Sequence, residues 1–186
     1  MPKIDQSKIL ILATNGFEQS ELEVPLHKLR EAGASVHVAS PESGEIRGWD
    51  GGDWGASVPV DVALGEVNRT DYNALVLPGG QINPDILRMN EDAVALIRGF
   101  VEAGQIVAAI CHAPWLLIEA GVVEGREMTS WPSLKTDLVN AGAKWEDSEV
   151  AISNGIITSR NPGDLTAFVA KIIEEVEEGR HERDAA

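Results

Sequence analysis

Three continuous apolar runs constrain the fold of this chain most strongly. Residues 8–13 read KILILA, residues 74–80 read ALVLPGG and residues 105–110 read QIVAAI. Runs without polar alternation are typical of strands buried on both faces, and segments with helical spacing lie between them. Alternating strands and helices form a mostly parallel sheet with helices on both faces. At 186 residues, the chain is therefore expected to form a single α/β domain, a doubly wound three-layer sandwich.

The remaining elements follow from periodicity and from helix-start and turn signals. Ser130 is a plausible cap with Pro132 in the first turn that follows it. Asn154-Gly155 is typical of a hairpin turn. We expect the core to span about residues 8–178 and residues 179–186 to form a flexible tail. The predicted helices cover residues 17–31, 92–102, 113–120, 130–140 and 161–178; a strand covers 35–40, and a Gly- and Trp-rich β-ribbon or flap covers 46–62.

Ligand sites in such sheets lie at the carboxyl ends of the strands. That rule brings together TNGFE after the first strand, the end of LVLPGG, and the end of VAAIC. Cys111 ends the third of these strands and precedes a helix, the topology of a nucleophile elbow. A thiol near a helix N-terminus is expected to have a lowered pKa and to react as a thiolate. The alternative is a buried structural cysteine, which is the more common use of a lone cysteine.

Three further groups can serve this thiol. His112 either partners the sulfur as a base or merely starts a helix. The backbone N–H of His112 and that of Gly80 are candidates for an oxyanion hole, because the Gly79-Gly80 pair lets the backbone approach a ligand. Glu18 opens the first helix, where a carboxylate is also favourable for purely structural reasons. A protonated Glu18 could instead hydrogen-bond the thiolate and hold its pKa down.

Charge and cysteine content exclude several classes of protein. The net charge of -15 opposes binding to a nucleic-acid backbone, although a single nucleotide stays possible as a substrate. One cysteine cannot form an internal disulfide, and no apolar run resembles a signal peptide or a membrane span. We therefore expect a cytoplasmic protein without a membrane association. The four histidines show no metal-ligand spacing, and no phosphate loop or dinucleotide fingerprint occurs, so neither a metal nor a cofactor is expected.

The segments AAICHAPW, LVLPGG, NGFEQSELEVP, GREMTSWPSLKTDLVNAGAKW and SRNPGDL together resemble the PfpI-type intracellular cysteine protease and general stress protein family. This family shares a superfamily with the Parkinsonism-associated deglycase and with class I glutamine amidotransferases. The resemblance runs from about residue 8 to residue 178. It implies a flavodoxin-like sandwich with a cysteine at the elbow. It also implies a cofactor-free hydrolase, acting on peptides, on glyoxal-type adducts, or on methylglyoxal to give lactate.

Carried over by position, the resemblance assigns Cys111 as nucleophile, Glu18 as the carboxyl group under its sulfur, and His112 as the adjacent histidine. It assigns Gly80 and His112 to the oxyanion hole. Asp85 matches an acidic residue that reaches the histidine from a neighbouring subunit, which implies a homo-oligomer, a dimer or a hexamer. Asp85 could instead merely start a helix, with Asn83 as cap and Pro84 in the first position.

Tryptophans mark the expected substrate pocket. Trp131 occupies the place of an active-site tyrosine of the archaeal proteases, and an indole N–H only donates, which favours a small aldehyde over a peptide. We expect Trp115, Trp131 and Glu21 to line the pocket, and Trp49 and Trp54 to lie in the flap, a candidate dimer interface. Core packing is the common alternative for such aromatic residues.

Three functions stay open on this basis. The first is a stress-response cysteine hydrolase with deglycase, glyoxalase or peptidase activity. The second is a redox-sensing or chaperone-like stress protein in which Cys111 is oxidised. The third is a glutamine amidotransferase, which needs a histidine far downstream of the cysteine, where only His181 stands.

Overall fold

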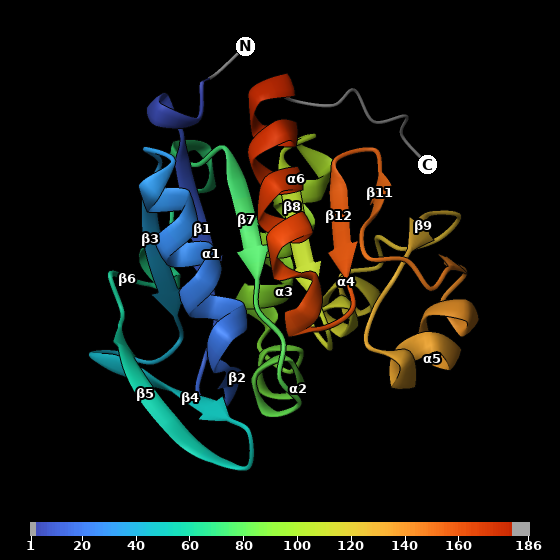
Figure 1. Ribbon diagram of the computed structural model, residues 1–186, viewed down its shortest axis with the longest axis horizontal. Helices are drawn as coiled ribbons and strands as arrows, with labels where there is room; N and C mark the ends of the chain where they lie inside the picture. The colour runs from blue at the N-terminus through green and yellow to red at the C-terminus, as the bar shows by residue number, and fades with distance from the viewer. Residues whose placement is uncertain (1–2, 180–186) are drawn as a thin grey trace.

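A seven-stranded sheet forms the centre of the computed structural model, which describes residues 3–179. Within those residues the strand order is β11-β12-β8-β7-β1-β3-β6, and all neighbours are parallel except β11 and β12. Figure 1 shows the sheet with helices in front of it and behind it. The strands are β1 (Lys8–Leu12), β3 (Ser35–Ser40), β6 (Val62–Ala63), β7 (Ala74–Leu77), β8 (Ile106–Ile110), β11 (Ala151–Ser153) and β12 (Ile156–Ser159).

Two apolar cores lie on the two faces of this sheet. Ile9 and Ile11 of β1 pack with helices α1 (Gln19–Glu31) and α6 (Leu165–Glu178). Leu10 and Leu12 point to the opposite face and pack with α3 (Glu91–Glu102) and α4 (Pro114–Glu119). Successive side chains of a strand alternate between faces, so an uninterrupted apolar run is what a two-sided core requires. The predicted flavodoxin-like three-layer sandwich is confirmed.

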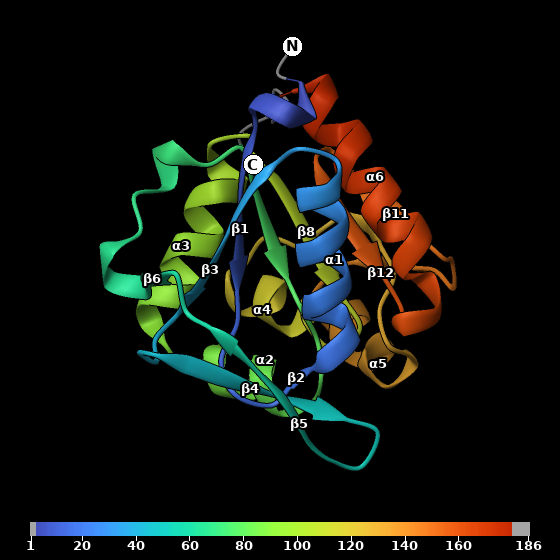
Figure 2. The same ribbon diagram turned by 60° about the vertical axis from the view of Figure 1, so that its left-hand side comes forward.

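A two-stranded ribbon extends from the end of the sheet at which β1 and β7 terminate (Figures 1 and 2). It consists of β4 (Glu45–Asp50) and β5 (Asp53–Pro59), which pair antiparallel as the sequence pattern predicts. Its strand β4 also pairs with the two-residue strand β2 (Phe17–Glu18). The ribbon thus crosses the chain directly after the first sheet strand, where the site is expected.

Smaller elements complete the chain. Helices α2 (Ile82–Leu87) and α5 (Lys135–Asn140) are short, and β9 (Glu127–Met128) pairs with β10 (Lys144–Trp145). The single-turn 3-10 helices are η1 (Ile4–Gln6), η2 (Leu64–Glu66), η3 (Arg69–Asp71), η4 (Pro132–Leu134) and η5 (Pro162–Asp164).

Three sequence-based boundaries are wrong. The first helix begins at Gln19, because Phe17 and Glu18 are engaged as strand β2. The helix expected from Ser130 starts with η4 at Pro132, and the Ser130 hydroxyl donates to the Trp131 carbonyl instead of capping it. Asn83 lies inside α2, where its side chain accepts from the Thr14 N–H, so it is not the cap.

Across residues 3–179, no helix has the length and apolar character that a bilayer crossing demands. The predicted flexible tail, residues 179–186, lies outside the described residues apart from Gly179.

Candidate active site

Cys111 stands at a sharp bend between β8 and α4. Its φ is 65°, in the left-handed region that side chains other than glycine rarely adopt. The neighbouring backbone holds this bend on both sides: the Cys111 N–H donates to the Ser159 carbonyl at 3.0 Å, and its own carbonyl accepts from the Trp131 N–H at 2.9 Å. Strained backbone that its surroundings enforce is concentrated at functional sites. The predicted elbow is therefore present.

The bend brings Cys111 against its chain neighbour. The sulfur lies 3.1 Å from Nδ1 of His112, although adjacent residues of a regular strand would point apart. Burial lowers the pKa of His112, so the ring is neutral at pH 7 and Nδ1 can accept the thiol proton. The ring is fixed between two indoles, edge-on to Trp115 and stacked on Trp131.

A buried carboxyl group lies on the other side of the thiol, and it belongs to Glu21. Glu21 is fully buried on α1, accepts the Gly79 N–H at 2.9 Å through Oε2, and hydrogen-bonds with the Cys111 thiol. Burial raises its pKa to about 8, and the neighbouring Glu18 carboxylate contributes to the rise. Glu21 is therefore protonated at neutral pH and can donate a proton.

The sequence-based assignment of Glu18 to the place under the sulfur is wrong. Glu18 is the N-cap of α1, and its Oε2 accepts from the Glu21 N–H at 2.9 Å and from the Ser20 hydroxyl. One helical turn separates Glu18 from Glu21, and the helix turns Glu21 inward while Glu18 stays half-buried at the cavity rim. Glu21, predicted only as a pocket residue, is the residue whose carboxyl group lies next to the Cys111 sulfur.

The expected lowering of the Cys111 pKa is also wrong for this structure. Burial raises the pKa of the thiol above its usual range, and the Glu21 carboxyl raises it further. The N–H groups of Gly80 and His112 hydrogen-bond the sulfur and act in the opposite direction, but they are the weaker influence. The resting site thus holds a neutral thiol and a neutral carboxylic acid at pH 7.

Those same two N–H groups are the predicted oxyanion donors. Both lower the pKa of the thiol, so they lie near the sulfur, and an oxygen on a carbon bonded to that sulfur would lie within their reach. Gly80 has φ 81°, and a Cβ there would stand 2.6 Å from the Gly16 carbonyl oxygen. A Cβ on Gly79 would stand 2.4 Å from Oε2 of Glu21 and 2.7 Å from Cβ of Cys111. The glycine pair is what lets Glu21 and Cys111 approach each other.

A half-open cavity of about 400 Å³ lies beside this cluster. Trp131 and Glu21 line it, as predicted, but Trp115 does not; its indole N–H donates to Asp137 outside. The flap also contributes Trp49, a role that the sequence pattern did not indicate. The full lining is Gly16, Glu18, Glu21, Trp49, Gly51, Gly80, Gln81, Ile82, Cys111, His112, Trp131 and Pro162.

Within residues 3–179, no acidic side chain takes the predicted place beside the histidine. Asp85 is exposed on α2. Nε2 of His112 is buried, and no residue in the range 3–179 hydrogen-bonds it. A buried ring nitrogen without a partner is uncommon, so the site has an open position at Nε2.

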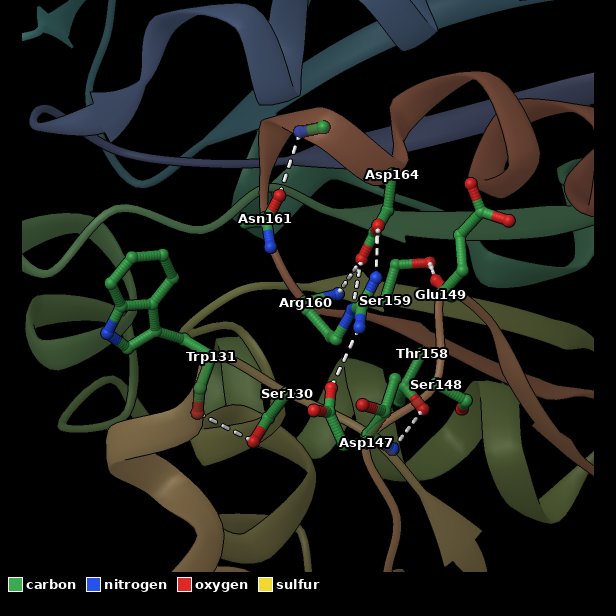
Figure 3. A network of polar contacts seen from close by, with 12 residues as sticks. Ser130, Trp131, Asp147, Ser148, Glu149, Thr158, Ser159, Arg160, Asn161 and Asp164 are labelled. Carbon is green, nitrogen blue, oxygen red and sulfur yellow. Dashed lines mark hydrogen bonds and ion pairs between the residues drawn. The ribbon is translucent and has the colours of Figure 1, made fainter.

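A charged network supports the strand end that holds the elbow (Figure 3). Arg160 follows Ser159, and its Nε and Nη2 reach the two carboxylate oxygens of buried Asp164 at 2.9 Å each. The Arg160 N–H also donates to Asp164, while Nη1 pairs with exposed Asp147. Ser159 donates through its hydroxyl to the Glu149 carbonyl. The network fixes the Ser159 carbonyl that accepts the Cys111 N–H.

In the part of the chain that the structure describes, no three His, Cys, Asp or Glu side chains gather as a metal site. The cluster can nevertheless perform acid–base and nucleophilic chemistry, because it combines a thiol, a neutral imidazole and a neutral carboxylic acid.

Comparison with known proteins gives a consistent picture. The model of the DJ-1/PfpI family matches residues 7–175. Deglycase TK1284 of Thermococcus kodakarensis is 46% identical over 166 residues, which are 89% of this chain and 97% of that protein. General stress protein 18 of Bacillus subtilis is 39% identical, over 87% of this chain and 92% of its own. The crystal structure of Drosophila melanogaster DJ-1beta superposes with a TM-score of 0.82 at 31% identity, covering 96% of this chain and 95% of that one.

Proposed function

Because the chain belongs to the DJ-1/PfpI family, we propose that it is a stress-related cysteine hydrolase that converts methylglyoxal and its adducts, with Cys111 as the nucleophile. One observation supports this proposal most directly. The Cys111 sulfur, at a left-handed bend, is contacted by His112 Nδ1, by the Glu21 carboxyl group and by two backbone N–H groups.

The first step in this proposal is addition to the aldehyde. The neutral His112 Nδ1 takes the thiol proton as the Cys111 sulfur bonds to C1 of methylglyoxal. The C1 oxygen receives the displaced electron pair, and the N–H groups of Gly80 and His112 stabilise the resulting charge until it is protonated. Because the resting thiol is neutral, the thiolate forms only during this attack.

The second step is an internal redox exchange that needs no cofactor. The hydrogen on C1 leaves as a proton and a proton is delivered to C2, so C1 becomes a thioester carbonyl and C2 becomes an alcohol carbon. Glu21, whose pKa is about 8, is suited to carry protons at this stage. Water then cleaves the thioester, which releases lactate and restores the thiol. The sum is methylglyoxal plus water giving lactate and a proton.

Adducts enter the same sequence. In an amine adduct the C1–N bond breaks and nitrogen regains its proton as the C1–S bond forms; in a thiol adduct the C1–S bond to the substrate breaks in its place. One water is consumed, and the products are the free amine or thiol and lactate. Peptide hydrolysis is a further candidate, but a cavity volume of about 400 Å³ favours the smaller substrates.

An assay panel tests the proposal. Purified protein is incubated with methylglyoxal, with glycated amines and thiols, and with fluorogenic peptides, and lactate, free amine or thiol and fluorescence are measured. We expect lactate from the first two classes of substrate and at most weak peptide cleavage. Absence of turnover on all of them would contradict the proposal.

The redox or chaperone-like alternative is less well supported. A sensor cysteine requires an accessible thiol of low pKa. Burial raises the pKa of Cys111, so its thiol is protonated at neutral pH and slow oxidation is expected.

We also propose that the protein works as a homo-oligomer in the cytoplasm, with Asp85 of one subunit at His112 of another. Two observations support this. Nε2 of His112 is buried and unpartnered within residues 3–179, and Asp85 is exposed on α2 beside the exposed side chains of Ile86 and Met89. Apolar side chains next to Asp85 are suited to an interface.

A further inference from the structure

We propose that the cavity beside Cys111 selects adducts carried on a guanidinium group, such as glycated arginine, over adducts carried on thiols or aliphatic amines. The adduct chemistry rests on the proposed function, whereas the selectivity rests on the cavity wall and can be measured without turnover. A guanidinium is planar and permanently charged, and each of these two properties has a counterpart in the wall.

Aromatic faces supply the counterpart to planarity. Trp131 stacks one face on His112, with ring centroids 5.9 Å apart and an interplanar angle of 21°, and its side chain is 39% exposed. Trp131 also lines the cavity, so its exposed indole surface is available to a ligand there. Trp49 adds a second indole from the ribbon, held edge-on against Trp54 at 5.5 Å. A guanidinium stacks flat on indole, whereas an ammonium or a thioether presents no planar face.

Glu18 supplies the counterpart to the charge. Both hydrogen bonds that its side chain accepts from described residues reach Oε2, which leaves Oε1 for a ligand at the cavity rim. The lining contains no lysine or arginine among the described residues, and the chain carries a net charge of -15. Such a wall attracts a cation and gains nothing from a neutral thiol adduct.

The selected group also suits the products of the reaction. When the C1–N bond of a guanidinium adduct breaks and nitrogen regains its proton, the released side chain is again a planar cation. Lactate, the other product, is an anion and is repelled by the same Glu18 carboxylate. The free arginine side chain is therefore a ligand of the same wall and can serve as a stable probe.

Isothermal titration calorimetry on the wild-type protein provides the test. The ligands are Nα-acetylarginine amide, its neutral planar isostere Nα-acetylcitrulline amide, the non-planar cation Nα-acetyllysine amide, and guanosine. We expect the arginine compound to bind about tenfold or more tightly than each of the others. Trp131→Leu and Glu18→Gln should each abolish most of this preference, because they remove the stacking face and the carboxylate.

Glu23→Gln is the matched control, since it removes the same charge from the helix that Glu18 caps, at a residue outside the cavity lining. It should keep the preference, and circular dichroism should show all three variants folded. Equal affinities for the four ligands, no binding of any, tightest binding of guanosine, or an unchanged preference in both Trp131→Leu and Glu18→Gln would overturn the inference. Lactate formation by the same samples separates the two proposals, because turnover without this preference leaves only the proposed function standing.

Discussion

The Cys111 sulfur lies 3.1 Å from Nδ1 of His112, the residue that follows it in the chain. Two consecutive side chains meet because Cys111 has a φ of 65°, which bends the chain sharply between β8 and α4. Two hydrogen bonds hold this strained backbone in place: the Cys111 N–H donates to the Ser159 carbonyl, and the Cys111 carbonyl accepts from the Trp131 N–H. The site is therefore sensitive to substitutions in the segments that hold the Cys111 backbone as well as to substitutions of the site residues.

Glu21 should make the free energy of unfolding depend on pH. Its pKa is about 8 in the folded chain and 4.5 as the ordinary value, so the folded state binds more protons between those pH values. Stability should therefore fall as pH rises through this window, by up to about 1.4 kcal/mol per pH unit for one proton. Glu21→Gln keeps the shape and removes the titration, so its stability curve should be flatter.

Urea unfolding between pH 5 and 9 measures this difference. Glu23→Gln, on the same helix, should follow the wild type. Parallel curves for the wild type and Glu21→Gln would show that Glu21 does not titrate as the structure indicates.

Gly79→Ala tests the close approach of Glu21 and Cys111. The new Cβ would stand 2.4 Å from Oε2 of Glu21 and 2.7 Å from the Ile110 carbonyl oxygen, so backbone or carboxyl must move. We expect a loss of about 1–3 kcal/mol of stability and a larger relative loss of turnover. Gly65→Ala is the control, because its Cβ would meet nothing within 4 Å. Equal behaviour of the two variants in thermal unfolding and lactate assays would argue against a tightly packed pair.

Asp164→Asn tests whether the Arg160–Asp164 pair supports the backbone bend at Cys111. Arg160 pairs with both Asp164, whose side chain is 5% exposed, and Asp147, whose side chain is 68% exposed. An exposed ion pair contributes little to the free energy of unfolding, whereas removal of one charge from a buried pair is strongly destabilising. We expect Asp164→Asn to lower the thermal midpoint more than Asp147→Asn does. We also expect kcat of Asp164→Asn to be about twofold or more below that of Asp147→Asn. If Asp147→Asn is the more damaging, the network does not act through Ser159.

Subunit mixing tests the shared site. Cys111→Ala and Asp85→Ala should each be poor enzymes, and a mixture that exchanges subunits should regain part of the activity, because some interfaces then combine intact Cys111 and His112 with intact Asp85. Native mass spectrometry verifies the exchange. Activity equal to the average of the two variants would reject the role of Asp85 across subunits.

Much of the fold follows from local patterns. The buried strands β1, β3 and β8 and the flap carry their signals in runs of five or more residues, and the structure has them where the pattern predicts. Strand β2 could not be predicted, since Phe17 and Glu18 become a strand only by pairing with β4, about thirty residues away. The same holds for Ser130, which bonds Trp145 across a loop instead of capping a helix.

The wrong assignment of Glu18 to the position that Glu21 occupies has a different cause. Both carboxylates lie in GFEQSE, and a motif gives their spacing but not the phase of the helix. A signal did exist: Glu21 falls on the buried stripe with Leu22, Pro25 and Leu29. A carboxyl group on the apolar stripe of a helix indicates a buried titratable residue, whereas Glu18 precedes that stripe and caps it. The raised pKa of Cys111 depends on burial, which no local pattern reports.

The central claim is that Cys111 is the nucleophile, and lactate formation from methylglyoxal by the wild type and by Cys111→Ala tests it most directly. The account predicts steady turnover by the wild type and none by Cys111→Ala, with circular dichroism spectra that coincide. Full activity of a folded Cys111→Ala variant would contradict it, because no other thiol exists in the chain to take its place.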